Sequence, residues 1–96
     1  MTHRDYTKVE QLKQLFLDEL MKARGIKCIA YQKAGIGKTK FFEWQREDIA
    51  FSEAINEIEE KWLDVAENKL MDLIAIGDRA ALMFYLKAKG RHRGYK

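Results

Sequence analysis

Apolar side chains recur at steps of three and four residues from residue 51 to residue 74, and this spacing constrains the fold more than any other feature. It predicts one amphipathic helix of about seven turns at 3.6 residues per turn. The apolar seam shifts by one residue at Lys69, where a strict coiled coil would keep its heptad, so a packed helix is favoured over a long zipper. The apolar positions are Phe51, Ile55, Ile58, Trp62, Val65, Leu70, Leu73 and Ile74.

Capping residues and glycines divide the rest of the chain into four shorter helices. Thr7 and Asp78 are expected N-caps, and Gly25, Gly35 and Gly77 are expected to end helices. The chain has no proline and no alternating Val/Ile/Thr run, which argues against a sheet. We therefore expect an all-α fold whose last two helices form a hairpin, followed by a flexible basic tail. The shorter helices are expected at residues 8–24, 26–34, 38–47 and 79–89.

The net charge of +3 hides a strong segregation of charge along the chain. Residues 22–46 contain seven basic side chains and one acidic one, a net +6, and residues 49–78 contain two basic and eight acidic ones, a net −6. Residues 79–96 contain six basic side chains and no acidic one. Blocks of this kind bear on partners rather than on fold. They predict a surface that binds polyanions and a separate element for assembly.

The stretch AGIGKTKFF, residues 34–42, contains Gly37-Lys38-Thr39, which is how a phosphate-binding loop ends. Such a loop also needs a glycine at position 32 and a preceding strand, but position 32 is Gln32 and the preceding segment is predicted to be helical. An ATP or GTP site is therefore not expected. No other pattern indicates an enzyme, a cofactor or a metal site: Cys28 is expected to be half-buried on a helix, and His3 and His92 lack the spacing of metal ligands.

The same stretch fits a helix-turn-helix, in which a tight glycine turn joins two short helices and the second lies in the DNA major groove. Small residues at 30 and 34 would let the helices approach, and apolar anchors are expected at Ile36, Phe41 and Trp44. The expected phosphate contacts flanking the motif are Lys22, Arg24, Lys27 and Lys33. The expected DNA-binding residues are Lys33, Gly37, Lys38, Thr39, Lys40, Phe42, Glu43 and Arg46.

These residue types suit different parts of a DNA duplex. The cations on the second helix would neutralise phosphates or reach guanine, and Thr39 would contact the backbone or a base edge. Glu43 would accept a hydrogen bond from cytosine. Phe42 points outward and would meet a thymine methyl group or pack on the long helix. A small helical bundle with a solvated basic face that binds no DNA is the alternative.

Two segments resemble the small terminase subunits of tailed phages and prophages. In IAYQKAGIGKTKFFEWQREDIAFSEAINE, residues 29–57, a small residue, an Ala-Gly pair, a threonine and an aromatic step precede ED-x-x-F-x-E-A, as in the helix-turn-helix of that family. The ending GDRAALMFYLKAKGRHRGY, residues 77–95, is the more specific match, with a Gly-Asp step, an apolar FYLK helix and RGY. The resemblance covers nearly the whole chain after about residue 10. Gly37 stands where the family usually has Ser or Thr, and Tyr31 where it usually has a small residue.

The resemblance implies a non-enzymatic protein that recognises a viral packaging site in double-stranded DNA. It further implies a ring-shaped homo-oligomer that delivers DNA to a large terminase subunit in the cytoplasm of a bacterial host. The domains expected are a helix-turn-helix domain over residues 1–48 and, over residues 49–96, a helical hairpin for oligomerisation with a basic tail. A dimeric helix-turn-helix transcriptional regulator and an oligomeric helical adaptor without DNA affinity are the alternatives.

Self-association is also expected from the residues alone, because the fifth helix is apolar nearly all round and one neighbouring helix cannot cover it. Its apolar run, residues 80–86, is far too short for a membrane span, and the polar N-terminus does not resemble a secretory signal. A single cysteine fits a reducing cytoplasm. The expected oligomerisation residues are Trp62, Leu73, Leu82, Phe84 and Tyr85.

Overall fold

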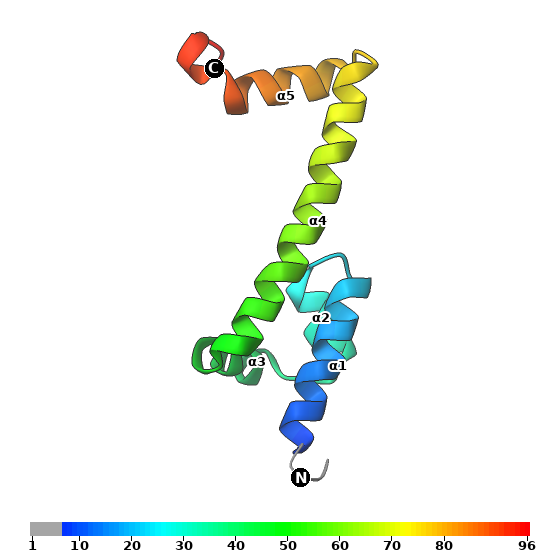
Figure 1. The fold of residues 1–96 in the computed structure, drawn as a ribbon, viewed down its shortest axis with the longest axis vertical. Coiled ribbons are helices and arrows are strands. Elements are labelled where there is room, and N and C mark those ends of the chain that lie inside the picture. The colour runs from blue at the N-terminus through cyan, green and yellow to red at the C-terminus, as the bar shows by residue number, and fades with distance from the viewer. Residues whose placement is uncertain (1–6) are drawn as a thin grey trace. The chain divides into compact units, whose positions relative to one another are not determined.

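A computed structural model describes residues 7–96 of the chain, and all of the regular structure in that range is helical (Figure 1). The all-α prediction is therefore confirmed for the described residues. Each expected helix is present, with its ends within two residues of the predicted ones. The elements are α1 (Lys8–Lys22), α2 (Lys27–Lys33), α3 (Lys38–Glu47), α4 (Ile49–Ala75), α5 (Arg79–Lys89) and the 3-10 turn η2 (Arg91–Arg93).

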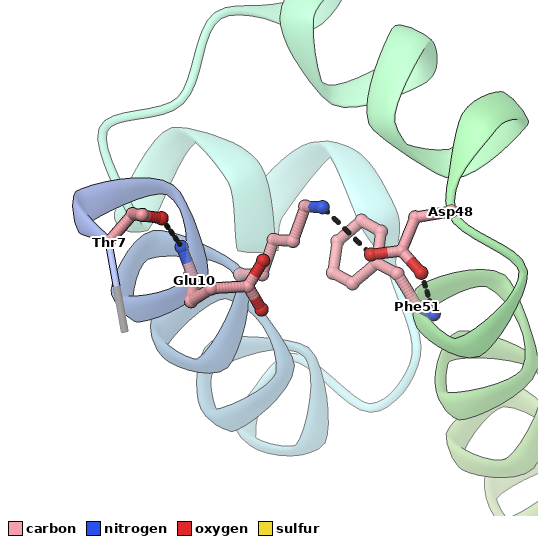
Figure 2. Close-up of polar contacts among 5 residues, drawn as sticks. Thr7, Glu10, Asp48 and Phe51 are labelled. Atoms are coloured by element: carbon pink, nitrogen blue, oxygen red, sulfur yellow. Dashed lines mark hydrogen bonds and ion pairs between the residues drawn. The ribbon is translucent and has the colours of Figure 1, made fainter. Parts of the chain in front are cut away.

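The helices begin where the sequence places capping side chains. The Thr7 hydroxyl accepts a hydrogen bond from the amide of Glu10 at 3.2 Å, which closes the first turn of α1 (Figure 2). The Asp78 carboxylate accepts one from the amide of Ala81 at 2.9 Å at the start of α5. Each bond satisfies an amide that has no partner inside the helix. Both predicted N-caps are confirmed.

Glycines at positive φ end α2 and α4. After α2, the amide of Ile36 donates to the carbonyl of Tyr31 at 2.8 Å and the amide of Gly35 donates to that of Gln32 at 3.1 Å. This paired pattern needs a left-handed residue, and Gly35 has φ +75°. Gly77 ends α4 in the same way, with φ +83°. The predicted stops at these two glycines are confirmed.

The described chain divides into two compact units, one extending to Trp62 and the other spanning Leu63–Lys96. The first unit has a core to which all of α1 to α3 contribute, and the start of α4 completes it. The first unit therefore extends past residue 48, where the sequence predicts the boundary between the DNA-binding domain and the oligomerisation region. The buried residues of this core are Phe16, Leu20, Ala30, Tyr31, Ala34, Ile36, Phe41, Phe51 and Ile55.

The second unit differs from the predicted hairpin. Within it, α5 leaves the end of α4 at a steep angle rather than folding back along it (Figure 1). Ala81 is the only buried residue of α5. The spacing of apolar residues predicts the length of each helix. It does not determine whether the apolar faces of α4 and α5 pack against each other. The tail after α5, predicted to be flexible, contains the turn η2. None of the described helices has the length and apolar character needed to cross a lipid bilayer.

The junction between α3 and α4 is organised by Asp48, a role that the sequence pattern did not predict. Its Oδ2 accepts a hydrogen bond from Lys13 Nζ at 2.8 Å and its Oδ1 accepts one from the amide of Phe51 at 3.1 Å (Figure 2). Lys13 Nζ also lies 5.5 Å from the ring centroid of Trp44, within the range of a cation–π contact. The hydrogen bond from Lys13, and then that from Phe51, lower the pKa of the Asp48 carboxyl from its ordinary value.

This lowered pKa makes stability depend on pH in a defined direction. The contribution of the Asp48 carboxylate is present above the unfolded-state pKa of about 3.9 and is lost as the pH falls through the lower native pKa. Replacing Asp48 with Asn removes the charge but keeps a capping oxygen. We therefore expect Asp48→Asn to lower the melting temperature at pH 7, and to lower it by less at pH 3, as measured by circular dichroism. Equal differences at the two pH values would contradict this, and Asp64→Asn on the exposed face of α4 is the matched control.

Candidate nucleic-acid interface

The rotational setting of α3 is fixed by Phe41, which is completely buried. Its ring centroid lies 4.6 Å from that of Phe16 on α1 and 5.3 Å from that of Tyr31 on α2. Aromatic pairs at such distances are favourable beyond the area that they bury. The expected anchoring of α3 by Phe41 is confirmed. Tyr31, where the resembled family usually has a small residue, is buried and is part of this contact.

Most of the residues expected to meet DNA lie on α3; the exceptions are Lys33, the last residue of α2, and Gly37, the N-cap of α3. Phe42, the neighbour of the buried Phe41, is 41% exposed and lies edge-on to the rings of Phe41 and Tyr31, at 5.0 and 6.4 Å. It therefore extends the aromatic cluster to the surface. Glu43 is half-buried. The other expected DNA-binding residues, Lys33, Gly37, Lys38, Thr39, Lys40 and Arg46, are all exposed.

The start of α3 is open to an anion. Gly37 is the N-cap residue and provides no side-chain hydrogen bond to the first turn. The first amides of a helix point along its axis and carry a partial positive charge, so they attract phosphate groups. Lys38 and Lys40 add two full charges in the same turn. Gly37 has φ −69°, and a Cβ at this position would meet no atom within 4 Å, so the structure does not require glycine here.

Lys40 has an internal partner in the free protein. Its Nζ lies 2.8 Å from Oε1 of Glu43, one turn further along α3. The hydrogen bond from Lys40 lowers the pKa of Glu43, and the same bond raises the pKa of Lys40. Both groups are therefore charged at neutral pH. Lys38 and Arg46, in contrast, have no ion pair among residues 7–96, so they are the more available cations of α3.

Three of the four flanking cations lie together. A hollow of about 410 Å³ at the corner between α1 and α2 is lined by apolar and mainly basic side chains, and no residue of α3 lines it. Arg24 lies there with φ +58°, a left-handed conformation that is costly for residues other than glycine. The fourth cation, Lys27, lies outside the hollow and pairs with Glu59 of α4 at 3.5 Å. The hollow is lined by Glu19, Lys22, Ala23, Arg24, Ile26, Ile29 and Lys33.

The remaining candidates for chemistry differ partly from expectation. Cys28 is exposed on α2, so its predicted half-burial is wrong; the apolar side of this short helix is made by Ala30 and Tyr31 instead. Within residues 7–96, no three His, Cys, Asp or Glu side chains lie grouped as they would around a metal ion. His3 lies outside the described residues.

The residues expected to mediate oligomerisation fall into two groups. Trp62 belongs to the first unit, where its indole Nε1 donates to the carbonyl of Met21 at 3.2 Å. Leu73 and Phe84 are exposed, and Phe84 is 62% exposed. Leu82 and Tyr85 are half-buried on α5. The second unit thus leaves large apolar side chains in solvent, whereas Trp62 already has an internal partner.

Comparisons with known proteins identify no relative. No protein-family model matches the chain, and neither a curated protein nor a solved structure matches it.

Proposed function

We propose that this chain is a non-enzymatic, oligomeric DNA-binding protein that selects viral DNA for packaging. In this proposal α3 enters the major groove of double-stranded DNA and α2 supports it. The observation that carries the proposal is the setting of α3: Phe41 is fully buried while Lys38, Thr39 and Lys40 face solvent at an uncapped helix start. Helix-turn-helix proteins contact base edges from this end of the recognition helix.

The viral role rests on the resemblance of residues 29–57 and 77–95 to small terminase subunits. The basic surface supports contact with DNA, and the exposed apolar side chains of the second unit support self-association. Delivery of DNA to a large terminase subunit, and action in the cytoplasm of a bacterial host, belong to the same proposal. A dimeric transcriptional regulator is the alternative. The solution mass distinguishes it from a packaging protein, because a packaging ring needs more than two subunits.

Binding to labelled duplexes across a range of salt concentrations tests the DNA-binding part. We expect fluorescence anisotropy to show an affinity that falls steeply with salt, because each neutralised phosphate releases counterions. The panel should include duplexes of unrelated sequence, since phosphate contacts alone carry no sequence information. If no duplex binds at low salt, the proposal is lost.

Assembly is tested at Phe84. Replacing this exposed ring with aspartate places a charge in the surface that we expect to be buried between subunits, and burying an unpaired charge is costly. We expect Phe84→Asp to shift the mass measured by light scattering toward monomers at micromolar concentration. Gln32→Asp, which places the same charge on the exposed side of α2, should leave the mass unchanged. An unchanged mass for Phe84→Asp would contradict the role of this face.

A further inference from the structure

The chain after the middle of α5 forms a folded hook, which we define as residues 85–96. Gly90 organises it: its amide donates to the carbonyl of Leu86 at 2.7 Å, and its carbonyl accepts from the amides of Arg93 at 2.8 Å and Tyr95 at 3.4 Å. Gly94, with φ +102°, provides the reversal that a side-chain-bearing residue rarely adopts. The hook therefore has a backbone structure of its own.

The Tyr95 ring lies directly on Gly90. A Cβ placed on Gly90 would be 3.0 Å from the ring of Tyr95 and 2.7 Å from the carbonyl oxygen of Leu86, so a larger residue would force the tail to move. Gly90 is correspondingly buried. Between the end of α5 and the returning tail is a hollow of about 280 Å³. It is lined by Tyr85, Leu86, Lys89, Gly90, His92, Arg93 and Tyr95.

The charge of the hook is entirely positive. It contains no acidic side chain, and none of its cations takes part in an ion pair within residues 7–96. Like charges held close together repel one another, so a fold that gathers them favours a polyanionic partner. The cations of the hook are Lys87, Lys89, Arg91, Arg93 and Lys96, all of them exposed.

We propose that the hook binds the phosphate backbone of nucleic acid without reading its sequence. Lysine and arginine neutralise phosphates, tyrosine hydroxyls donate to phosphate oxygens, and tyrosine rings stack on sugars or bases. The hollow combines all three, with Tyr85 and Tyr95 beside Lys89 and Arg93. An acidic protein segment would need the cations but would leave the tyrosine rings without a role. The site goes beyond the proposed function, because it does not depend on α3.

The test compares charge removal in the hook with the same removal elsewhere. Arg91→Gln/Arg93→Gln and Lys61→Gln/Lys69→Gln each lower the net charge by two, the second pair on exposed positions of α4. Anisotropy titrations of the full chain use a single-stranded oligonucleotide and several duplexes at a series of salt concentrations. We expect the hook variant to weaken binding to every probe and to lower the salt slope by about 2, close to one for each phosphate that is no longer neutralised. The α4 variant should keep the wild-type slope.

A second variant tests whether the folded hook is needed or only its charge. Gly90→Ala leaves the charge unchanged but displaces Tyr95, so we expect it to weaken binding several-fold on all probes. Three results would each overturn the site. They are wild-type affinity in Gly90→Ala, an unchanged salt slope in the arginine variant, and a wild-type chain that binds no probe. A change in the solution mass of either hook variant, with no change in its binding to nucleic acid, would also overturn the site. It would indicate that the hook contacts protein instead.

The two proposals fail separately. A chain that shows no sequence preference, and whose binding is insensitive to changes in α3, would contradict the proposed function. The same chain would still support the nucleic-acid site of the hook if the arginine variant lowers the salt slope of binding.

Discussion

Replacing Phe41 with alanine is expected to lower the free energy of unfolding by about 3–5 kcal/mol, the usual cost of removing a buried aromatic ring. Phe41 is fully buried and contacts the rings of Phe16, Tyr31 and Phe51, so the cavity would lie where three helices meet α3. A decrease of this size is a large part of the total stability of a small domain. Urea denaturation followed by tryptophan fluorescence measures it.

Phe42→Ala is the matched control, because it makes the same substitution one residue further along the same helix. Phe42 is 41% exposed and touches the core only at its edge, so we expect the free energy of unfolding to fall by less than about 1.5 kcal/mol. A rotation of α3 by one residue would exchange the two results. Equal decreases for the two variants would therefore contradict the setting of α3 on which the proposed interface depends.

Replacing Lys38, Lys40 and Arg46 together with glutamine is expected to have the largest effect on DNA binding. If each contacts one phosphate, the slope of log affinity against log salt should fall by about 3. If one of them reaches guanine instead, about 1–3 kcal/mol of discrimination should disappear at that base pair. We therefore expect affinity to fall by roughly tenfold to a hundredfold at low salt, with weaker preference among duplexes.

The control for this variant removes three cations from other surfaces. Lys8, Lys61 and Lys69 are exposed on α1 and α4, and replacing them with glutamine gives the same net charge. Affinity should then stay close to that of the wild-type chain. If the two triple variants bind alike, net charge alone attracts DNA and α3 has no special role. Circular dichroism should show both variants folded, since no substituted side chain is buried.

The helix boundaries were predictable because their signals are local. A hydroxyl or carboxylate at Thr7 and Asp78 satisfies an amide three residues later, and a glycine at position 35 or 77 can take a positive φ. These effects depend on a few neighbouring residues. The bounds of α3 and α5 accordingly agree with the prediction at both ends. The burial of Phe41 was predictable as well, since the helical period sets which residues share a face.

Contacts between distant segments could not be predicted in this way. Nothing near Lys13 indicates that its ammonium group meets Asp48, 35 positions away, although an Asp before an apolar run is a recognisable cap. The predicted hairpin of α4 and α5 was wrong for the same reason. The apolar composition of a helix indicates that it should pack against another surface, but it does not identify that surface. The packing of the Tyr95 ring on Gly90 depends on three backbone hydrogen bonds, and no pattern of residues predicts them.

Both tryptophans of the chain, Trp44 and Trp62, belong to the first unit. Their emission therefore reports on that unit alone, whereas far-ultraviolet ellipticity averages over helices of both. The position of Trp44 beside Lys13 and of Trp62 on the carbonyl of Met21 makes each indole a probe of a tertiary contact. Natural fluorescence and ellipticity together can thus follow the melting of the two units separately, without any engineered label.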